Sequence, residues 1–499
     1  MKKITHILIL FFISVSVNAQ IERFNRAYDM YGWGDYCSNV FETNYGYLVC
    51  GNVKDSLGNP GLGFLRIDFQ GNEIDKKFFA GPNQMNYQIL NGVANYTDST
   101  IYFAGIGQFP NLDISAIVVK TNMKGDTIWS KFVFDTTYNS QGGAIYREIN
   151  GDLLIVGSTD RTDPNVNILL VKTDSLGNFI WDKEYGVMGT YDTGWSIDKC
   201  DNDNGYVIGG GKYYFGPQIG RSYIINVDSS GNFQWQYEYG STIYQNWSAM
   251  VLYTQNNQII SAAAKGFYKD ITDNFWSKPN IQWLDENGGF INYREYAIDS
   301  FPSIAFDDLY EINANEYLFT GTFLTYPDQR MGLLKTNAGG DTIFGRTYQG
   351  INQWEFSKDV KPTSDGGYII AGFNYPGLNG VSQNYRVIKV DSLGCDTLGC
   401  ETVGIMEYEN SWNENENLLA FPNPSIGKFY IEIKNVPISP FFETKVEVYD
   451  LVGNMIFQSG NRLFQNLTEI DISNASPGIY LVKVFFNKNS VGSIRIIKE

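Results

Sequence analysis

The sequence predicts an all-β protein, a seven-bladed β-propeller followed by a small C-terminal Ig-like β-sandwich. Three observations lead to this fold class. A unit of 52 to 57 residues recurs seven times, each unit contains two hairpins, and the chain after Cys400 no longer follows the repeat. Repeats of about this period, each with four antiparallel strands, are typical of propellers. With 43% hydrophobic and 15% aromatic residues, the 499-residue chain can build such a core.

A short turn motif marks each unit, with an Asp or Asn three residues before a glycine. The seven pairs are Asp68 and Gly71, Asn122 and Gly125, Asp174 and Gly177, Asp228 and Gly231, Asp285 and Gly288, Asn337 and Gly340, and Asp391 and Gly394. The Asx side chain can bond the backbone two residues on, and glycine accepts the left-handed conformation that closes a bulged hairpin. The alternative is a calcium loop or the Asp-box of sialidases, but that box has a D-x-G spacing, one residue shorter. The motif therefore predicts turns.

The residues around each turn predict four strands per unit. The apolar run ILLVK at 168–172 is typical of a strand covered on both faces, and the alternating residues that follow the turn are typical of a strand nearer the rim. Earlier in the unit, DNDNGYVIGGG at 201–211 predicts another hairpin. DNDNG could be a set of calcium ligands, but the same position holds NYG at 44–46 and DGG at 365–367, and a turn explains all three. We therefore expect no cofactor and no metal; Ca²⁺ has no support.

The ring is expected to close through the start of the mature chain. GCDTLGC at 394–400 lacks the pattern of an outer strand, whereas residues 21–40 parallel residues 181–200. Residues 21–29 should therefore complete the last blade and leave no open edge. We also expect a small residue at one equivalent position of each first strand, because strands that crowd around a central axis leave little room for side chains. These residues are Ser38, Gly92, Gly143, Ser196, Ser248, Ala305 and Ser357.

The first 19 residues have the pattern of a secretory signal peptide. Lys2 and Lys3 precede an apolar stretch from Ile7 to Val17, and cleavage is expected after Ala19. A membrane-spanning helix needs roughly 20 apolar residues, about twice this stretch, and no later segment qualifies, so we expect no transmembrane segment.

The composition excludes several classes of function. The only histidine, His6, lies in the leader, which excludes Ser-His-Asp and Cys-His catalysis and disfavours a catalytic zinc or non-haem iron site. After removal of the leader, 35 basic residues face 54 acidic ones, a formal charge of −19. Such a surface is not expected to bind nucleic acid.

The five cysteines of this exported chain allow two disulfides. Cys395 and Cys400 are close enough in sequence to pair. Cys37 and Cys50 fall on adjacent strands of one hairpin, where a disulfide and two buried free thiols are equally good interpretations. Cys200 has no evident partner.

The C-terminal residues form a separate module. Three blocks, FPNPSIGKFYIEI at 421–433, VEVYDLVGNMIF at 446–457 and SPGIYLVKV at 476–484, resemble the type A sorting domain of the type IX (Por) secretion system of Bacteroidetes. The motif positions are Pro422, Asn423, Pro424, Gly427, Tyr449, Asp450, Gly453, Gly478 and Tyr480. Read without the resemblance, the same residues predict a β-sandwich. We expect a signal peptide at 1–19, the propeller at 20–400, a linker at 401–418 and the sorting domain at 419–499.

The resemblance implies a route and a partner. The leader would direct export through the inner membrane, and the tail would then be recognised by the type IX machinery, which places cargo on the cell surface or outside the cell. Release and attachment to lipopolysaccharide both stay open. The resemblance names no activity.

Long connections on one face of the propeller are expected to carry the ligand site, because loop surfaces commonly do. These connections are residues 52–63, 158–167, 212–222 and 265–280. Their candidate ligand-binding residues are Tyr213, Tyr214, Phe215, Tyr268, Trp276, Tyr326, Asp270 and Asp273, with Asp163 and Asp328 nearby. Aromatic rings beside carboxylates suit sugars, although the same rings could serve only to pack the loops.

Two functions remain. The first is a non-enzymatic surface module that binds an extracellular glycan or protein. The second is a glycoside hydrolase or polysaccharide lyase that uses two carboxylates near the axis, where Asp198, Asp307, Asp308 and Asp359 are the candidates. The regularity of the repeats favours binding, and blade 5, with its 57-residue spacing and its 265–280 connection, is the most irregular unit.

Overall fold

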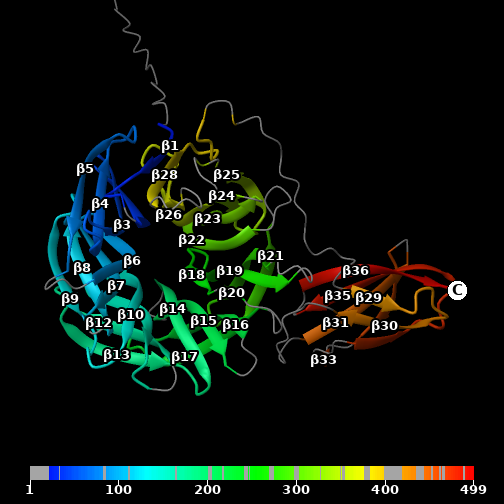
Figure 1. Cartoon of the computed structure of the whole chain (residues 1–499). Helices are drawn as coiled ribbons and strands as arrows, with labels where there is room; N and C mark the ends of the chain where they lie inside the picture. The colour runs from blue at the N-terminus through cyan, green and yellow to red at the C-terminus, as the bar shows by residue number, and fades with distance from the viewer. Residues whose placement is uncertain are drawn as a thin grey trace, which may run out of the picture.

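A computed structural model shows an all-β chain (Figure 1). The structure describes residues 22–32, 34–81, 86–110, 113–162, 166–200, 205–215, 219–240, 246, 248–268, 275–296, 303–325, 328–348, 350, 354–375, 383–397, 400, 418–433, 443–450, 453–459, 462–463, 467–486 and 489–499. Within these ranges no helix is long and apolar enough to cross a membrane.

Seven four-stranded antiparallel blades follow one another along the chain, as predicted. Blade 1 consists of β2 (Tyr36–Thr43), β3 (Gly46–Lys54), β4 (Pro60–Ile67) and β5 (Glu73–Phe79). Blade 2 consists of β6 (Asn86–Asn95), β7 (Thr100–Gln108), β8 (Ile114–Asn122) and β9 (Thr127–Phe132). Blade 3 consists of β10 (Ser140–Arg147), β11 (Leu153–Thr159), β12 (Asn167–Thr173) and β13 (Phe179–Tyr185). Blades 4 and 5 consist of β14 (Thr190–Lys199), β15 (Tyr206–Tyr214), β16 (Ile219–Val227) and β17 (Phe233–Tyr239); and β18 (Met250–Tyr253), β19 (Gln258–Tyr268), β20 (Phe275–Asp285) and β21 (Phe290–Glu295). Blade 6 is β22 (Ser303–Asn313), β23 (Glu316–Thr325), β24 (Asp328–Asn337) and β25 (Thr342–Thr347), and blade 7 is β26 (Trp354–Pro362), β27 (Tyr368–Tyr375), β28 (Asn384–Val390) and β1 (Phe24–Tyr28).

The blades close into a ring. The first strand of every blade contacts the first strand of both neighbouring blades, including β26 with β2. These strands surround the middle of the ring in Figure 1, and the fourth strands lie on its outside. The hydrophobic cores lie between successive blades, because each blade packs one face against the next.

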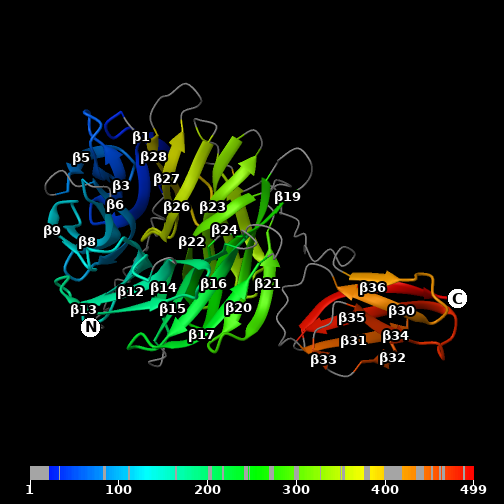
Figure 2. The ribbon, with the colours of Figure 1, turned by 60° about the horizontal axis from the view of Figure 1, so that its bottom comes forward.

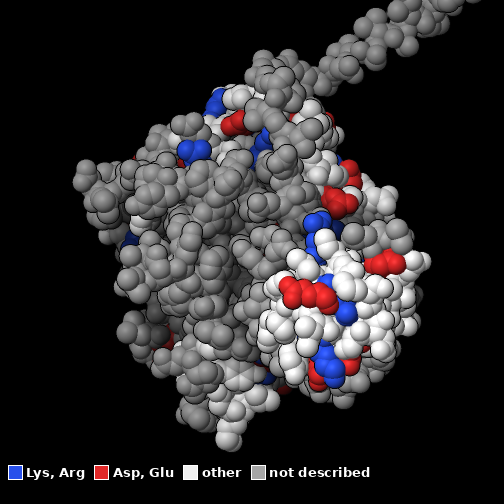
Figure 3. Space-filling view, turned by 90° about the vertical axis from the view of Figure 1, so that its right-hand side faces the viewer, with Lys and Arg blue, Asp and Glu red and all other residues white. Residues whose placement is uncertain are grey.

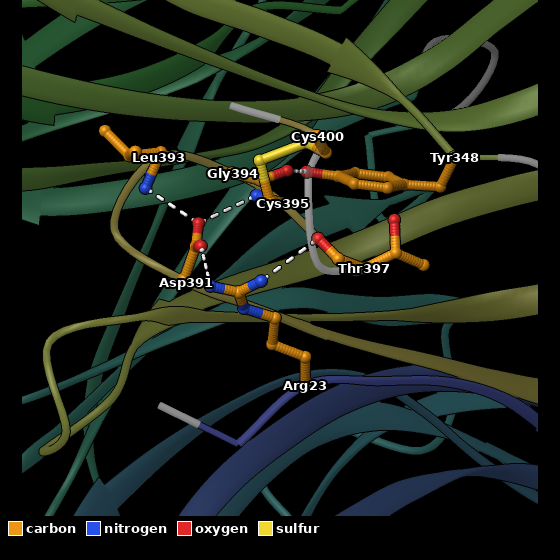
Figure 4. The surroundings of a disulfide bond; sticks show 8 residues. All are labelled: Arg23, Tyr348, Asp391, Leu393, Gly394, Cys395, Thr397 and Cys400. Carbon is orange, nitrogen blue, oxygen red and sulfur yellow. Dashed lines mark hydrogen bonds and ion pairs between the residues drawn. A yellow bond between two sulfur atoms is a disulfide. The ribbon is translucent and has the colours of Figure 1, made fainter. Parts of the chain in front are cut away.

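The start of the described chain supplies the outer strand of blade 7. β1 pairs antiparallel with β28, from Phe24 opposite Lys389 to Tyr28 opposite Tyr385. Arg23 forms an ion pair of 2.6 Å with Asp391 and donates a hydrogen bond of 3.0 Å to the carbonyl of Thr397. Figure 4 shows these contacts beside a disulfide between Cys395 and Cys400. The N-terminal and C-terminal ends of the propeller therefore hold each other.

The predicted Asx-Gly turns are confirmed in all seven blades. In the first, Asp68 accepts the N–H of Gly71 on its carbonyl at 3.0 Å, and its side chain accepts the N–H groups of Gln70 and Asn72 at 3.0 and 2.7 Å. The seven glycines have φ values from 75° to 86°, the left-handed region that glycine tolerates best. The carboxylates of this motif are thus occupied by backbone donors.

Each turn is also a contact between blades. A Cβ added at each of the seven glycines would lie within 3.0 Å of an aromatic side chain of the preceding blade. The covering residues, in blade order, are Phe24, Phe64, Trp129, Trp181, Trp235, Trp283 and Phe344. Four tyrosines, Tyr28, Tyr185, Tyr296 and Tyr348, donate hydrogen bonds of 2.6 to 3.0 Å to the carbonyl of the glycine that they reach. The recurrent motif is therefore mainly scaffold.

The predicted small-residue position on the first strand is wrong. Each first strand with a described start carries a β-bulge, and the residues named above fall at different distances from it: Ser38 is the bulge residue, Ser357 precedes the bulge and Gly92 lies beyond it. The fixed small residue stands on the second strand instead. There a Cβ would lie 1.8 to 2.3 Å from a carbonyl oxygen of the first strand, at Gly51, Gly105, Gly157, Gly210, Gly321 and Gly372. A bulge shifts the register, which repeat spacing alone does not reveal.

The second domain, orange to red in Figure 2, is a β-sandwich. One sheet contains β29 (Leu418–Phe421), β30 (Lys428–Ile433) and β34 (Leu467–Asp471), and the other contains β31 (Glu443–Asp450), β32 (Met455–Gln458), β33 (Arg462–Leu463), β35 (Gly478–Phe486) and β36 (Asn489–Lys498). Phe429 and Ile431 of the first sheet pack on Val446, Val448 and Val482 of the second. Figure 3 views this domain end-on, with its described acidic and basic side chains interspersed.

Candidate ligand-binding surface

The bulge makes it possible to compare positions near the start of the first strands of different blades. Four residues before the bulge, the chain lies opposite the end of the second strand, and we call these two facing residues the rim pair. In blade 7 the rim pair is Trp354 and Tyr375. In blade 4 it is Tyr191 and Tyr213.

The rim pair differs between blades. Blade 2 has Asn86 and Gln108, whose side chains form a hydrogen bond of 3.3 Å. In blade 3, Asn139 donates to Asp160 at 2.8 Å. In these two blades the polar side chains of the rim pair bond to each other. The aromatic pairs of blades 4 and 7 instead present carbon surface.

The aromatic cluster of blade 7 comprises Tyr36, Trp354, Phe356, Phe373 and Tyr375. Trp354 is 47% exposed and Tyr375 is 41% exposed. Below them the rings of Phe356 and Phe373 stack with centroids 5.0 Å apart, and Tyr36 of blade 1 lies 4.3 Å from Phe373. Trp354 and Tyr375 face each other across neighbouring strands, so their rings lie on the same side of the sheet. This packing fixes an aromatic surface that solvent reaches.

Charged groups border the aromatic cluster. Lys358, the bulge residue of β26, places its Nζ 5.6 Å from the centroid of the Tyr36 ring and 3.1 Å from Asp307. Burial lowers the pKa of Lys358, but the Asp307 carboxylate and the Tyr36 hydroxyl together outweigh burial, and the net pKa is raised. Lys358 is therefore positively charged at neutral pH. Thr322 donates to the other Asp307 oxygen at 3.3 Å. The cluster thus combines apolar rings with hydrogen-bonding groups, the pairing that a sugar ring requires.

Two of the three blade 4 candidates, Tyr213 and Tyr214, lie on β15, and Phe215 follows directly after it. β15 runs to Tyr214 and β16 resumes at Ile219, so the expected 212–222 connection is mostly a hairpin. The rings of Tyr213 and Phe215 meet edge to face with centroids 6.0 Å apart, and Phe215 is 48% exposed. Tyr214 instead donates to Glu238 at 2.8 Å, and burial raises its pKa. Tyr213 and Phe215 therefore come together with Tyr191, and Tyr214 is engaged separately.

The other expected connections are also shorter than predicted. β3 and β4 are joined by residues 55–59, where Asp55 and Gly58 repeat the Asx-Gly turn with hydrogen bonds of 2.9 Å. β19 and β20 extend the blade 5 hairpin to Tyr268 opposite Phe275. The long spacings thus build longer strands, and the prediction of long loops there is wrong.

For three further candidates from the sequence, only the position along the strand is described. Tyr268 lies at the end of β19, Trp276 lies on β20 opposite Phe267, and Asp328 begins β24. Asp163, Asp270, Asp273 and Tyr326 lie outside the described residues.

The axial carboxylates have structural partners. Asp198 accepts the N–H of Tyr253 from the next blade at 2.8 Å. Asp308 accepts from Val360 at 3.1 Å, and Asp359 accepts from Val40 at 2.8 Å. These three carboxylates therefore join neighbouring first strands.

Two of these carboxylates share one lysine. Lys361 lies 3.4 Å from Asp308 and 2.6 Å from Asp359. Burial raises the pKa of Asp308 to about 7, against the opposing influence of Lys361. Asp307 is the exception among the four candidates, because it pairs with Lys358 at the edge of the aromatic cluster. Within the described residues, no group of three or more His, Cys, Asp and Glu side chains could hold a metal ion.

Tyr191, Trp354 and Tyr375 were not predicted from the sequence as candidate site residues. One signal was available: Tyr191 and Trp354 each stand 40 residues before the turn glycine of their own blade. Their rim partners could not be identified without the register, because a bulge intervenes.

In the C-terminal domain the motif residues shape the sandwich. The side chain of Asn423 bonds the carbonyl of Arg495 and the N–H of Ile497, both at 2.9 Å. Asp450 and Gly453 form another Asx-Gly turn, and Gly427, with a φ of 112°, accepts the N–H of Ile472 at 2.7 Å. Tyr480 donates to the carbonyl of Ser476 at 2.5 Å, Gly478 begins β35, and Tyr449 lies on β31. Pro422 and Pro424 follow cis peptide bonds.

Comparison with known proteins identifies the tail. Residues 419–499 match the family described as secretion system C-terminal sorting domain. The tail therefore directs export by the type IX secretion system to the cell surface or the extracellular space. A comparison with curated proteins found no match.

Solved structures are similar at low identity. An ulvan lyase of polysaccharide lyase family 25 is 10% identical, with 74% of this chain and 97% of that chain covered and a TM-score of 0.47. An α-L-arabinofuranosidase from Fusarium graminearum is 12% identical, with 60% and 92% covered and a TM-score of 0.43. The β-propeller domain of the trilobed protease from Pyrococcus furiosus is 9% identical, with 71% and 94% covered and a TM-score of 0.40. No activity is transferred from them to this chain.

Proposed function

We propose that this exported β-propeller is a non-enzymatic glycan-binding protein and that the aromatic cluster of blade 7 is a binding site. The observation that carries the proposal is the exposed rim pair, Trp354 and Tyr375, in which the Tyr375 ring contacts the stacked rings of Phe356 and Phe373. A side chain that already packs on its neighbours loses less conformational entropy when a ligand binds, and the Tyr375 ring packs on Phe356 and on the buried Phe373.

The neighbouring ion pair suits the edges of a sugar. Lys358 offers N–H donors and Asp307 offers acceptor oxygens, and the Lys358 ammonium lies over the Tyr36 ring of the aromatic cluster. We therefore favour a glycan over a protein as the ligand.

The enzymatic alternative draws less support. A retaining or inverting glycosidase needs two carboxyl groups free to act on the substrate. Asp198, Asp308 and Asp359 each accept a hydrogen bond from a backbone N–H group of the next blade on one carboxylate oxygen. The raised pKa of Asp308 is the one property that resembles a general acid.

The test is a glycan array on mature propeller, followed by calorimetry with a bound polysaccharide. Trp354→Ala and Tyr375→Ala should each weaken binding by about tenfold, or about 1.4 kcal/mol, because each removes a stacking ring. Phe179→Ala is the matched control, since Phe179 is 56% exposed on the outer strand β13, and it should change nothing.

A second assay separates binding from catalysis. Release of reducing ends or unsaturated sugars from the bound polysaccharide should stay at background. Release that disappears in the Asp307→Asn, Asp308→Asn double variant would replace the proposal with a carboxylate-dependent hydrolase or lyase. An array with no glycan bound would overturn the proposal.

A further inference from the structure

The rim pairs of blades 4 and 7 are structurally equivalent. Tyr191 and Trp354 both stand four residues before the bulge of their strand. Each also forms a single parallel bridge to the preceding blade, Tyr191 with Val166 and Trp354 with Gln329. Because their positions and their neighbours correspond, the two pairs occupy equivalent positions in two different blades.

The two pairs also share their chemistry. Tyr191 is 41% exposed, close to the exposed fractions of Trp354 and Tyr375. Blade 4 adds the exposed ring of Phe215 beside Tyr213. In blades 2 and 3 the same position holds the polar pairs described above. Selection of aromatic residues at two equivalent positions indicates one kind of ligand surface at both.

The two pairs lie on one face of the ring and on opposite sides of its middle. Every blade repeats one antiparallel strand order, and its first strand contacts the first strands of both neighbouring blades, so we take the starting ends of the first strands to share a face. In Figure 1 β26 and β14 lie above and below the centre of the ring. A single flexible chain that crosses the middle of this face can therefore meet both pairs.

We propose that the two rim pairs are two subsites for one polymeric glycan. This inference rests on the proposed function and names its ligand class, a polysaccharide rather than a short oligosaccharide. Once one pair has bound a segment of the chain, binding of the second segment becomes intramolecular, and the affinity for the polymer rises without any new contact. A short oligosaccharide fills each pair separately.

The experiment compares a trisaccharide with its parent polymer. The probes are cello-, xylo-, manno- and laminari-trisaccharides and the corresponding soluble polysaccharides, measured by calorimetry on the mature chain. Wild type and the Phe179→Ala control should bind two trisaccharides per chain. The Trp354→Ala, Tyr375→Ala variant and the Tyr191→Ala, Tyr213→Ala variant should each bind one.

The polymer gives the independent readout. Its affinity should exceed that of the trisaccharide by about a hundredfold and fall to the trisaccharide level in either double variant. The Tyr191→Phe, Tyr213→Phe variant keeps both rings and should retain the affinity for the polymer. This result would show that binding needs the aromatic rings and not the hydroxyl groups.

The possible failures are distinct. One trisaccharide per wild-type chain, with polymer binding untouched by Tyr191→Ala, Tyr213→Ala, would overturn the two-subsite inference and leave the proposed function standing. Polymer binding no tighter than trisaccharide binding would also overturn it. If no trisaccharide and no polysaccharide binds, the proposed function fails and the inference fails with it.

Discussion

Asp35 is a carboxylic acid with no exposed surface at the entry to the first blade. Its Oδ2 accepts the N–H of Met30 at 2.7 Å. Burial raises the pKa of Asp35 to about 7, Asp29 raises it further, and the Met30 N–H and Lys76 act in the opposite direction. In the unfolded chain the same group has a pKa of about 3.9.

This difference makes stability depend on pH. Between the two pKa values the folded chain holds a proton that the unfolded chain has lost, so the free energy of unfolding falls as pH rises. The fall is at most ~1.4 kcal/mol per pH unit for one group. Burial also raises the pKa values of Asp192, to about 6, and of Asp308, to about 7, and these groups act in the same direction.

The substitution Asp35→Asn should remove the contribution of this carboxyl group to the pH dependence of the free energy of unfolding. We expect the gain in stability over wild type to be larger at pH 8 than at pH 5, because pH 5 lies near the lower end of the interval between the two pKa values and pH 8 lies beyond its upper end. Urea unfolding at both pH values measures the difference. Asp55→Asn is the control, because hydrogen bonds from Asn59 lower the pKa of Asp55 and its titration lies below this range. A variant that parallels wild type from pH 5 to pH 8 would show that Asp35 is ionised in the folded chain.

At the residue level, prediction from sequence depended on locality. The Asx-Gly turns were predictable because Asp68 and Gly71 complete their hydrogen bonds within five residues. Cys37 and Cys50 are buried free thiols, one of the two interpretations left open. The acceptor roles of Asp308 and Asp359 were not predictable, because each depends on a backbone N–H of another blade.

At the level of the element, β1 carries the ring closure. Phe24 covers Gly71 of blade 1, in the place that Trp181 has over Gly231. Tyr28 donates to the carbonyl of Gly71 at 2.7 Å. A single strand therefore joins the last blade to the first with the same contacts that join the other blades.

Removal of residues 20–30 should strongly destabilise the propeller. The deletion exposes the edge of β28 and removes the buried ring of Phe24, whose loss alone is worth about 3 to 5 kcal/mol. We expect a marked decrease of the melting temperature, measured by differential scanning calorimetry. Addition of a synthetic peptide of residues 20–30 should restore part of it. An unchanged melting curve would contradict the closing role of β1.

The sequence predicted which strands exist and how they pair better than it predicted where the strands end. The likeness of residues 21–40 to 181–200 was sufficient to suggest the β1 pairing, because aromatic and turn positions coincide. The loops at 52–63 and 212–222 were misjudged because β-strands can simply lengthen into a hairpin, and polar or glycine-rich residues do not exclude that.

At the level of the whole molecule, function is expected where the sevenfold repeat is broken. The turns, the aromatic covers and the second-strand glycines recur around the ring and build it. The rim pairs do not recur: they are polar in blades 2 and 3 and aromatic in blades 4 and 7. Sequence spacing located the repeat, but the register after each bulge was needed to find the positions that depart from it.

The most direct measurement is a crystal structure of the mature chain with an oligosaccharide from the polymer that it binds. We predict sugar density stacked on Trp354 and Tyr375, with hydroxyl groups within hydrogen-bond distance of Lys358 or Asp307. Sugar density at another surface, with these rings uncovered, would contradict the assignment of the site.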